Sequence, residues 1–145
     1  MRALYQARVM EHARRPRHLG LLAGATHAAT EHNRLCGDVV TLSLRIDGAR
    51  IVEVAFEGAG CALSTASASM LTDAIEGASP EDARRIQGAV LAMVEGPEPP
   101  APDAMDALGE LAALSSVRAF PGRARCVTLA WQALASALGE DGRPA

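Results

Sequence analysis

The feature that most constrains this fold is a run of residues that are apolar at every second position between 39 and 46. The alternating residues that form one face are Val40, Leu42, Leu44 and Ile46. This period of two predicts a β-strand with one buried face. The pair Asp47-Gly48, typical of tight hairpin turns, follows directly, and a second strand is expected over 51–56. The sequence therefore predicts an antiparallel hairpin over about 39–57.

The register of this hairpin depends on the turn. A two-residue loop would pair Leu44 with Ile51, whereas an odd-length loop or a bulge would place Leu42 and Leu44 on one face with Val52 and Val54. A slip of one residue moves every side chain to the opposite face, so the apolar pattern should decide. We expect a bulged or three-residue turn around Gly48.

Helical spacing of apolar residues marks most of the remaining chain. Helices are expected over 3–14, from Cys61 to a stop at Gly77, from Ser79 to Gly96, over 103–114 and over 124–138. Ser79-Pro80-Glu81-Asp82 is a strong helix start, with a capping serine, a proline and acids in the first turn. Residues 21–35 show no period and are predicted to be a loop or an extended arm. A helix, a hairpin and then further helices indicate an α+β domain with a small antiparallel sheet packed against several helices.

Length, composition and charge narrow the class of protein. The 145 residues are expected to form a single domain, 1–145, and 49% hydrophobic with 21% charged residues is typical of a globular chain. A net charge of −3 argues against a nucleic-acid binder. No stretch has the roughly 20 apolar residues of a membrane span, and the N-terminus lacks a signal-peptide pattern. We therefore expect a cytoplasmic protein with reduced thiols, no membrane association and no nucleic-acid partner.

Three cysteines lie where the backbone is expected to change direction. Cys36, with Gly37 and Asp38, precedes the first strand, while Cys61 and Cys126 lie at helix starts. Because helix N-termini stabilise anions, we expect the pKa values of Cys61 and Cys126 to be lowered. Three thiolates and the Asp38 carboxylate would make a tetrahedral set for zinc, or a partial set for iron. The alternative is three buried cysteines that act as small apolar side chains, since the spacing matches no zinc finger.

Other polar residues give weaker signals. The four histidines, all within the first 32 residues, show no ligand spacing and are interpreted as solvated or structural. A hydrolase with a cysteine nucleophile is the least favoured class, because no motif places a histidine base. Arg123 and Arg125 would offset the negative charge of a thiolate site or contact a partner.

The amino-acid sequence around the cysteines resembles that of a known family. The resemblance lies in His12 with Pro16 and Gly20, in Cys36-Gly37-Asp38, in the segment from Phe56 to Met70, and in the segment from Phe120 to Trp131. These motifs resemble the NifU/IscU-like iron–sulfur cluster assembly proteins, over nearly the whole chain from Leu4 to Leu138.

Within that family, the chain is most similar to the SufU branch. Arg125 stands where the scaffold branch carries a histidine, and the Leu-Pro-Pro-Val-Lys chaperone motif of that branch is absent. The 64 residues between Cys61 and Cys126 resemble the insertion that distinguishes the SufU branch. One departure is Asn33-Arg34-Leu35, where the family usually has a proline before the first cysteine.

The resemblance implies a SufU/IscU-like fold and a zinc-dependent acceptor of persulfide sulfur from a SufS-like cysteine desulfurase, which is a pyridoxal-phosphate enzyme. By position, Cys36 is the acceptor, while Cys36, Asp38, Cys61 and Cys126 are the zinc ligands. Downstream iron–sulfur assembly proteins would be further partners. Two alternatives stay open: a non-enzymatic scaffold that assembles a [2Fe–2S] cluster on the same residues and hands it on, and a binding module with a structural zinc.

Overall fold

The structure is a computed structural model that describes residues 2–33 and 37–139, with side chains from Gln6 onward. Its first half comprises α1 (Arg2–Arg14), β1 (His27–Asn33), β2 (Asp38–Asp47), β3 (Arg50–Ala59) and α2 (Ala62–Ile75). Its second half comprises α3 (Pro80–Glu95), α4 (Pro102–Leu108), the 3-10 helices η1 (Gly109–Ala119) and η2 (Pro121–Arg123), and α5 (Ala124–Leu138). The expected α+β class is confirmed.

The sheet has three antiparallel strands in the order β1-β2-β3, so the predicted hairpin gains an edge strand. The prediction of a loop or an extended arm over 21–35 is wrong for residues 27–33, which form β1. This strand pairs with β2 from His27 opposite Leu44 to Asn33 opposite Asp38. Alternate residues of β1 do face inward, but they are polar or small, and His27 and Asn33 are the buried ones. Because none of these residues is a large apolar one, their period of two does not identify a strand in the sequence.

The register of the hairpin β2–β3 includes the expected bulge. Leu42 lies opposite Phe56 and Leu44 opposite Val54, and the register shifts between Arg45 and Ile46. A two-residue turn between Asp47 and Arg50 contains Gly48 at φ 64°. The predicted partner Val54 is confirmed, but Val52 has no partner in the register and is only half-buried. The irregularity expected at the turn therefore lies in β3 instead. The bulge at Val52 allows a two-residue turn while Val54 still pairs with Leu44.

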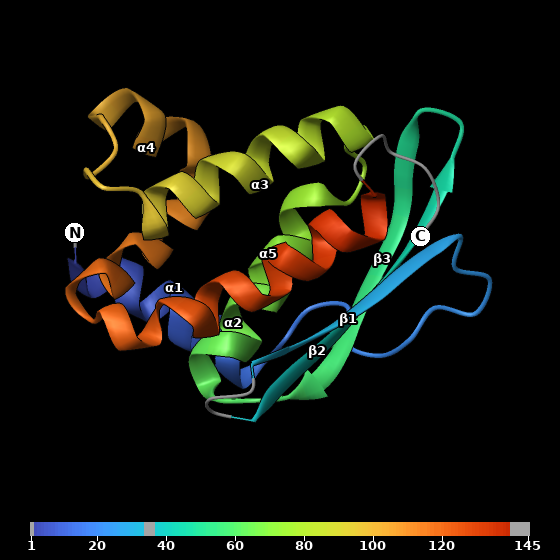
Figure 1. Ribbon diagram of the computed structural model, residues 1–145, viewed down its shortest axis with the longest axis horizontal. Coiled ribbons are helices and arrows are strands. Elements are labelled where there is room, and N and C mark those ends of the chain that lie inside the picture. Colours follow the sequence, from blue (N-terminus) through green and yellow to red (C-terminus); the bar gives the residue numbers. More distant parts are fainter. Residues whose placement is uncertain (1, 34–36, 140–145) are drawn as a thin grey trace.

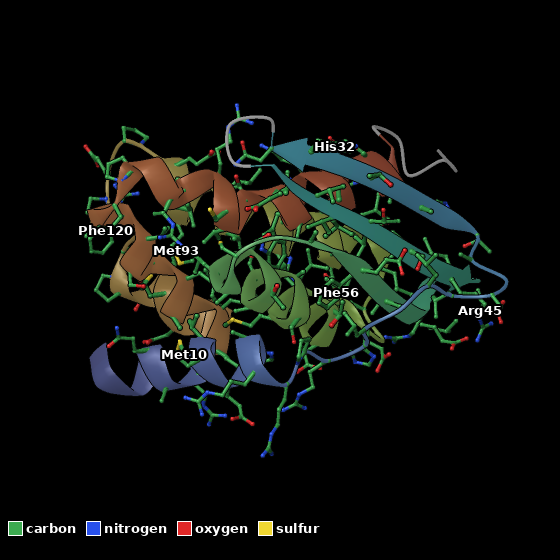
Figure 2. All side chains as sticks on the ribbon, turned by 90° about the horizontal axis from the view of Figure 1, so that it is seen from below. Met10, His32, Arg45, Phe56, Met93 and Phe120 are labelled. Atoms are coloured by element: carbon green, nitrogen blue, oxygen red, sulfur yellow. The ribbon has the colours of Figure 1, made fainter. Side chains whose placement is uncertain are left out.

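Helices α2 and α5 pack against the sheet, and α1 and α3 cover them on the side away from it (Figure 1). The core between these layers is aliphatic, and its largest fully buried side chain is Trp131 of α5. Figure 2 shows the same layering from below, with α1 outermost. Helix α5 has the predicted bounds of 124–138, and Ser79 caps α3 by accepting the Asp82 N–H.

The helix expected over 103–114 is only partly correct. Helix α4 ends at Leu108, and Gly109 adopts a φ of 57°, in the left-handed region that favours glycine. The chain then continues as η1, which buries Leu111, Leu114 and Val117. Within the described ranges, no helix combines the length and apolar character needed to cross a membrane.

Candidate metal centre

Two helix starts bring Cys61 and Cys126 together. Cys61 is the N-cap of α2, and its Sγ accepts the backbone N–H of Ser64 at 3.4 Å. Cys126 lies in the first turn of α5 and is buried. Because α2 and α5 pack side by side in the core, their N-terminal ends present both thiols to one place.

Asp38 joins the two thiols from the first position of β2. Its carboxylate and the sulfurs of Cys61 and Cys126 all lie within 4.8 Å of one another. The side chain is buried, and Oδ2 makes no hydrogen bond with the described residues. A buried carboxylate oxygen without a donor is costly, and a cation bound between it and two sulfurs would satisfy it.

The donor set fits zinc, which takes thiolates and carboxylates in tetrahedral sites of four ligands. Three of the four predicted ligands are thus within reach of one ion. The fourth, Cys36, lies outside the described residues, directly before Gly37 in the chain. The Gly37 N–H donates to the Asn33 carbonyl oxygen at 2.8 Å.

The two thiols differ in acidity. Burial raises the pKa of Cys61, but the Ser64 N–H, the Cys126 thiol and Arg123 together outweigh it, so the pKa is lowered. Burial, followed by hydrogen bonding and repulsion from Cys61, raises the pKa of Cys126 to about 11. The expectation of two lowered values is therefore wrong for Cys126. Burial, together with the hydrogen bond and the repulsion from Cys61, outweighs the helix N-terminus at Cys126.

Arg123 supplies the positive charge at this pair. Its Nη2 donates to Cys61 Sγ at 3.7 Å, and its contacts with Cys61 and Cys126 raise the pKa of the guanidinium. A cleft with a volume of about 610 Å³ lies at this site, and Arg123 and the exposed Arg125 both line it. The other lining residues are Asn33, Asp38, Cys61, Gly122 and Cys126.

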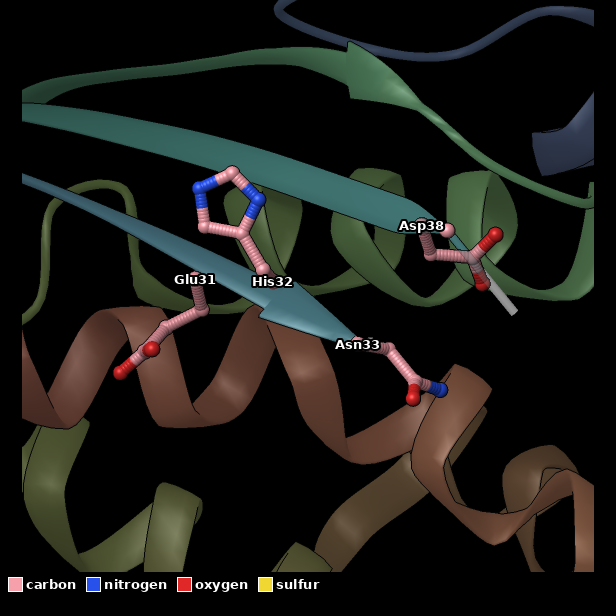
Figure 3. A pocket seen from close by; sticks show the side chains of 5 residues that line it. Glu31, His32, Asn33 and Asp38 are labelled. Carbon is pink, nitrogen blue, oxygen red and sulfur yellow. The ribbon is translucent and has the colours of Figure 1, made fainter. Parts of the chain in front are cut away.

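A second hollow adjoins the site at the ends of β1 and β2 (Figure 3). Glu31, His32, Asn33, Gly37 and Asp38 line its volume of about 490 Å³. Asn33 lies opposite Asp38 in the sheet and lines both hollows. Sequence reasoning missed Asn33, because its segment carries no strand pattern that would place it beside Asp38.

The described histidines lie outside the group of Asp38, Cys61 and Cys126, which we call the thiol site. Among the described residues, a second group of metal-ligand types comprises His12, Asp73 and Glu110. His12 is buried, with Nδ1 2.7 Å from Ser69 Oγ and Nε2 3.2 Å from Glu110 Oε1. The acids of this group also face Arg8 and Arg17, each at 3.8 Å. We interpret the group as a structural link between α1, α2 and η1.

The geometry of the thiol site agrees with a family match. The model of the NifU-like N terminal domain matches residues 4–138, which include Asp38, Cys61 and Cys126. The chain belongs to the NifU/IscU-like family. Both hollows at the thiol site lie within the matched span.

Known NifU/IscU-like proteins are similar over most of this chain. The iron–sulfur cluster assembly scaffold protein IscU of Streptococcus pyogenes serotype M1 is 44% identical, with 93% of this chain and 82% of that protein covered. The zinc-dependent sulfurtransferase SufU of Bacillus subtilis (strain 168) is 37% identical, with 95% and 91% covered.

Solved structures of NifU/IscU-like proteins also match the fold. A crystal structure from Fervidobacterium islandicum AW-1, described as an iron–sulfur cluster assembly scaffold protein for the SUF system, has a TM-score of 0.83 and 31% identity. The match covers 91% of this chain and 94% of that one. The IscU/SufU-like fold expected from the sequence is therefore confirmed.

Proposed function

We propose that this protein takes part in iron–sulfur cluster assembly as a zinc-dependent acceptor of persulfide sulfur from a cysteine desulfurase. The observation that carries the proposal is the grouping of Asp38, Cys61 and Cys126 within 4.8 Å, with the Arg123 guanidinium on Cys61. The similarity to the zinc-dependent sulfurtransferase of Bacillus subtilis, at 37% identity, supports this choice.

Cys36, Asp38, Cys61 and Cys126 would hold the zinc ion. Bound zinc would keep its thiolate ligands deprotonated without adding redox chemistry. Cys61 is fixed at the N-cap of α2, Cys126 in the first turn of α5, and Asp38 by the sheet. Arg123 offsets the negative charge that these ligands gather.

Cys36 would act as the acceptor by thiol–disulfide chemistry. Its thiolate attacks the terminal sulfur of the desulfurase persulfide, so that one sulfur–sulfur bond forms as another breaks. The desulfurase cysteine leaves as a thiolate, and Cys36 then carries the persulfide. The step balances without an external oxidant or reductant. Downstream assembly proteins would take the sulfur from Cys36.

A scaffold function is the second candidate. The same four residues would hold a [2Fe–2S] cluster as cargo and pass it to an acceptor protein. The similarity to the scaffold protein of Streptococcus pyogenes, at 44% identity, favours this alternative. Against it stands the position before Cys126, where Arg125 offers a guanidinium that cannot ligate iron.

Zinc content tests the proposed ligand set. We expect one zinc per chain in the purified wild-type protein and a large loss of zinc in Cys61→Ser, measured by elemental analysis. The matched control is Asp73→Asn, which alters the group around His12 and should keep its zinc. Zinc bound by Cys61→Ser with wild-type affinity would contradict a site that includes Cys61.

The acceptor assignment has its own test. After incubation with a persulfidated cysteine desulfurase, mass spectrometry should find the added sulfur on Cys36 in the wild-type protein. Cys36→Ser should remain unlabelled although the other two thiols are present. Added sulfur confined to Cys126 would reverse the assignment.

A further inference from the structure

Gly60 lies directly before the N-cap residue Cys61, at the point where β3 gives way to α2. A Cβ atom placed on Gly60 would lie 3.1 Å from both Cγ and Oδ1 of Asp38, and 3.1 Å from Ser64 Oγ. These distances are shorter than ordinary van der Waals contact, so a methyl group here would force the neighbouring groups to move. Gly60 does not have a positive φ, and therefore the space and not the backbone conformation requires glycine.

This close approach differs from that of Gly58, two residues earlier. A Cβ on Gly58 would meet the backbone oxygen of Val39 at 2.0 Å, which is a contact within the sheet. The atoms nearest to Gly60 belong instead to the side chains of Asp38 and Ser64. Substitution at Gly60 would thus displace a candidate ligand more directly than it would disturb the sheet.

The Asp38 carboxylate depends on this packing. Its Oδ2 is buried and has no hydrogen bond to a described residue, so no donor fixes that oxygen. Oδ1 and Cγ lie 3.1 Å from the position that a Cβ on Gly60 would take. A methyl group at that position would make the carboxylate shift by a few tenths of an ångström and would change its position relative to the two thiols.

We propose that Gly60 is a positioning residue for the candidate metal centre: its missing side chain provides the space in which the Asp38 carboxylate lies beside Cys61 and Cys126. This inference rests on the proposed function, because it assumes that Asp38 is a ligand. It adds Gly60, which would not contact the metal itself but sets the position of Asp38, which would.

The test compares zinc affinity in Gly60→Ala and in the wild-type protein by competition with a chromophoric chelator. Loss of a residue that orients a ligand weakens metal binding by about 10- to 100-fold, and we expect a loss in this range. The absorption spectrum of the Co²⁺-substituted protein should also change, because the carboxylate is displaced. The matched control is Gly88→Ala in α3, where a Cβ would meet nothing within 4 Å. That variant should keep wild-type affinity and spectrum.

A double-mutant cycle separates this mechanism from a general effect on folding. In an Asp38→Ala background, Gly60→Ala should weaken zinc binding by less than about twofold, because the displaced carboxylate is already gone. If Gly60→Ala alone folds poorly, Asp38→Ala should restore its thermal stability for the same reason. Equal losses from Gly60→Ala in both backgrounds would overturn the inference.

The outcomes also distinguish this inference from the proposed function. A wild-type protein that binds zinc, with a Gly60→Ala variant of equal affinity and unchanged Co²⁺ spectrum, would overturn only the role of Gly60. A wild-type protein with no zinc affinity would overturn the proposed function and this inference together.

Discussion

At the residue scale, Cys61 and Cys126 differ in acidity although each lies at the start of a helix. The pKa of Cys61 is lowered despite burial, because a backbone N–H, the second thiol and Arg123 stabilise its thiolate. The pKa of Cys126 is raised to about 11, by burial and by the neighbouring Cys61. In the metal-free protein Cys61 is therefore the more acidic thiol of the pair, and it loses its proton at a lower pH than Cys126.

Alkylation of the metal-free protein tests this difference. As the pH rises, Cys61 should react with iodoacetamide at a lower pH than Cys126, because only the thiolate is nucleophilic. Mass spectrometry of the modified peptides across the pH range gives the midpoint for each thiol, which separates acidity from accessibility. Arg123→Gln should raise the midpoint of Cys61, and denatured protein should show equal midpoints. A lower midpoint for Cys126 than for Cys61 would contradict this order of acidity.

At the element scale, a buried hydrogen-bonded link holds α2 against α5. Ser67 Oγ donates to the Val127 carbonyl at 2.7 Å and accepts the Trp131 Nε1–H at 3.1 Å. Both Ser67 and Trp131 are fully buried. Since Val127 follows Cys126, this link fixes the distance between the helix starts that carry the two thiols.

Ser67→Ala should lower the free energy of unfolding of the metal-free protein by about 1–3 kcal/mol, because it leaves the buried Trp131 Nε1–H without an acceptor. Urea denaturation measures the change. The control is Ser116→Ala, whose hydroxyl donates to the Ala113 carbonyl at an exposed position and should matter little. Equal stability of Ser67→Ala and wild type would show that the link does not hold the two helices together.

Elements with strong local signals were predictable from the sequence, and those without them were not. The alternation of β2, the capping serine of α3 and the apolar spacing of α5 each identify their element. Strand β1 faces inward with polar side chains, so only its pairing with β2 reveals it. The break at Gly109 depends on a positive φ that a glycine permits but does not demand.

The site was predictable in its composition but not in its electrostatics. The positions of the cysteines and the family resemblance both indicated Asp38, Cys61 and Cys126, which the fold brings together from three separate elements. The raised pKa of Cys126 follows from its burial and from the closeness of Cys61, which are properties of the folded chain. The closeness of Gly60 to the Asp38 side chain likewise joins the segment after β3 to the start of β2, and it has no local signature.

At the scale of the whole molecule, the thiol site lies where the sheet meets the first turns of two core helices. Asp38 comes from β2, Cys61 from the start of α2 and Cys126 from α5, and these elements pack in the core. Phe120, labelled in Figure 2, is an exposed aromatic residue with 64% of its surface accessible, and it lies three residues before Arg123 in the chain. The centre is thus held by the core, while the exposed residues Arg123 and Arg125 line its cleft.

Desulfurase turnover is the measurement that tests the central claim most directly. A cysteine desulfurase should turn over faster with the zinc-loaded protein than with the metal-free protein, and faster than with zinc-loaded Cys36→Ser. A parallel anaerobic reconstitution with iron and sulfide should give a cluster that is lost rapidly. No acceleration by the zinc form, together with a persistent cluster passed intact to an acceptor apoprotein, would contradict the account and identify a scaffold.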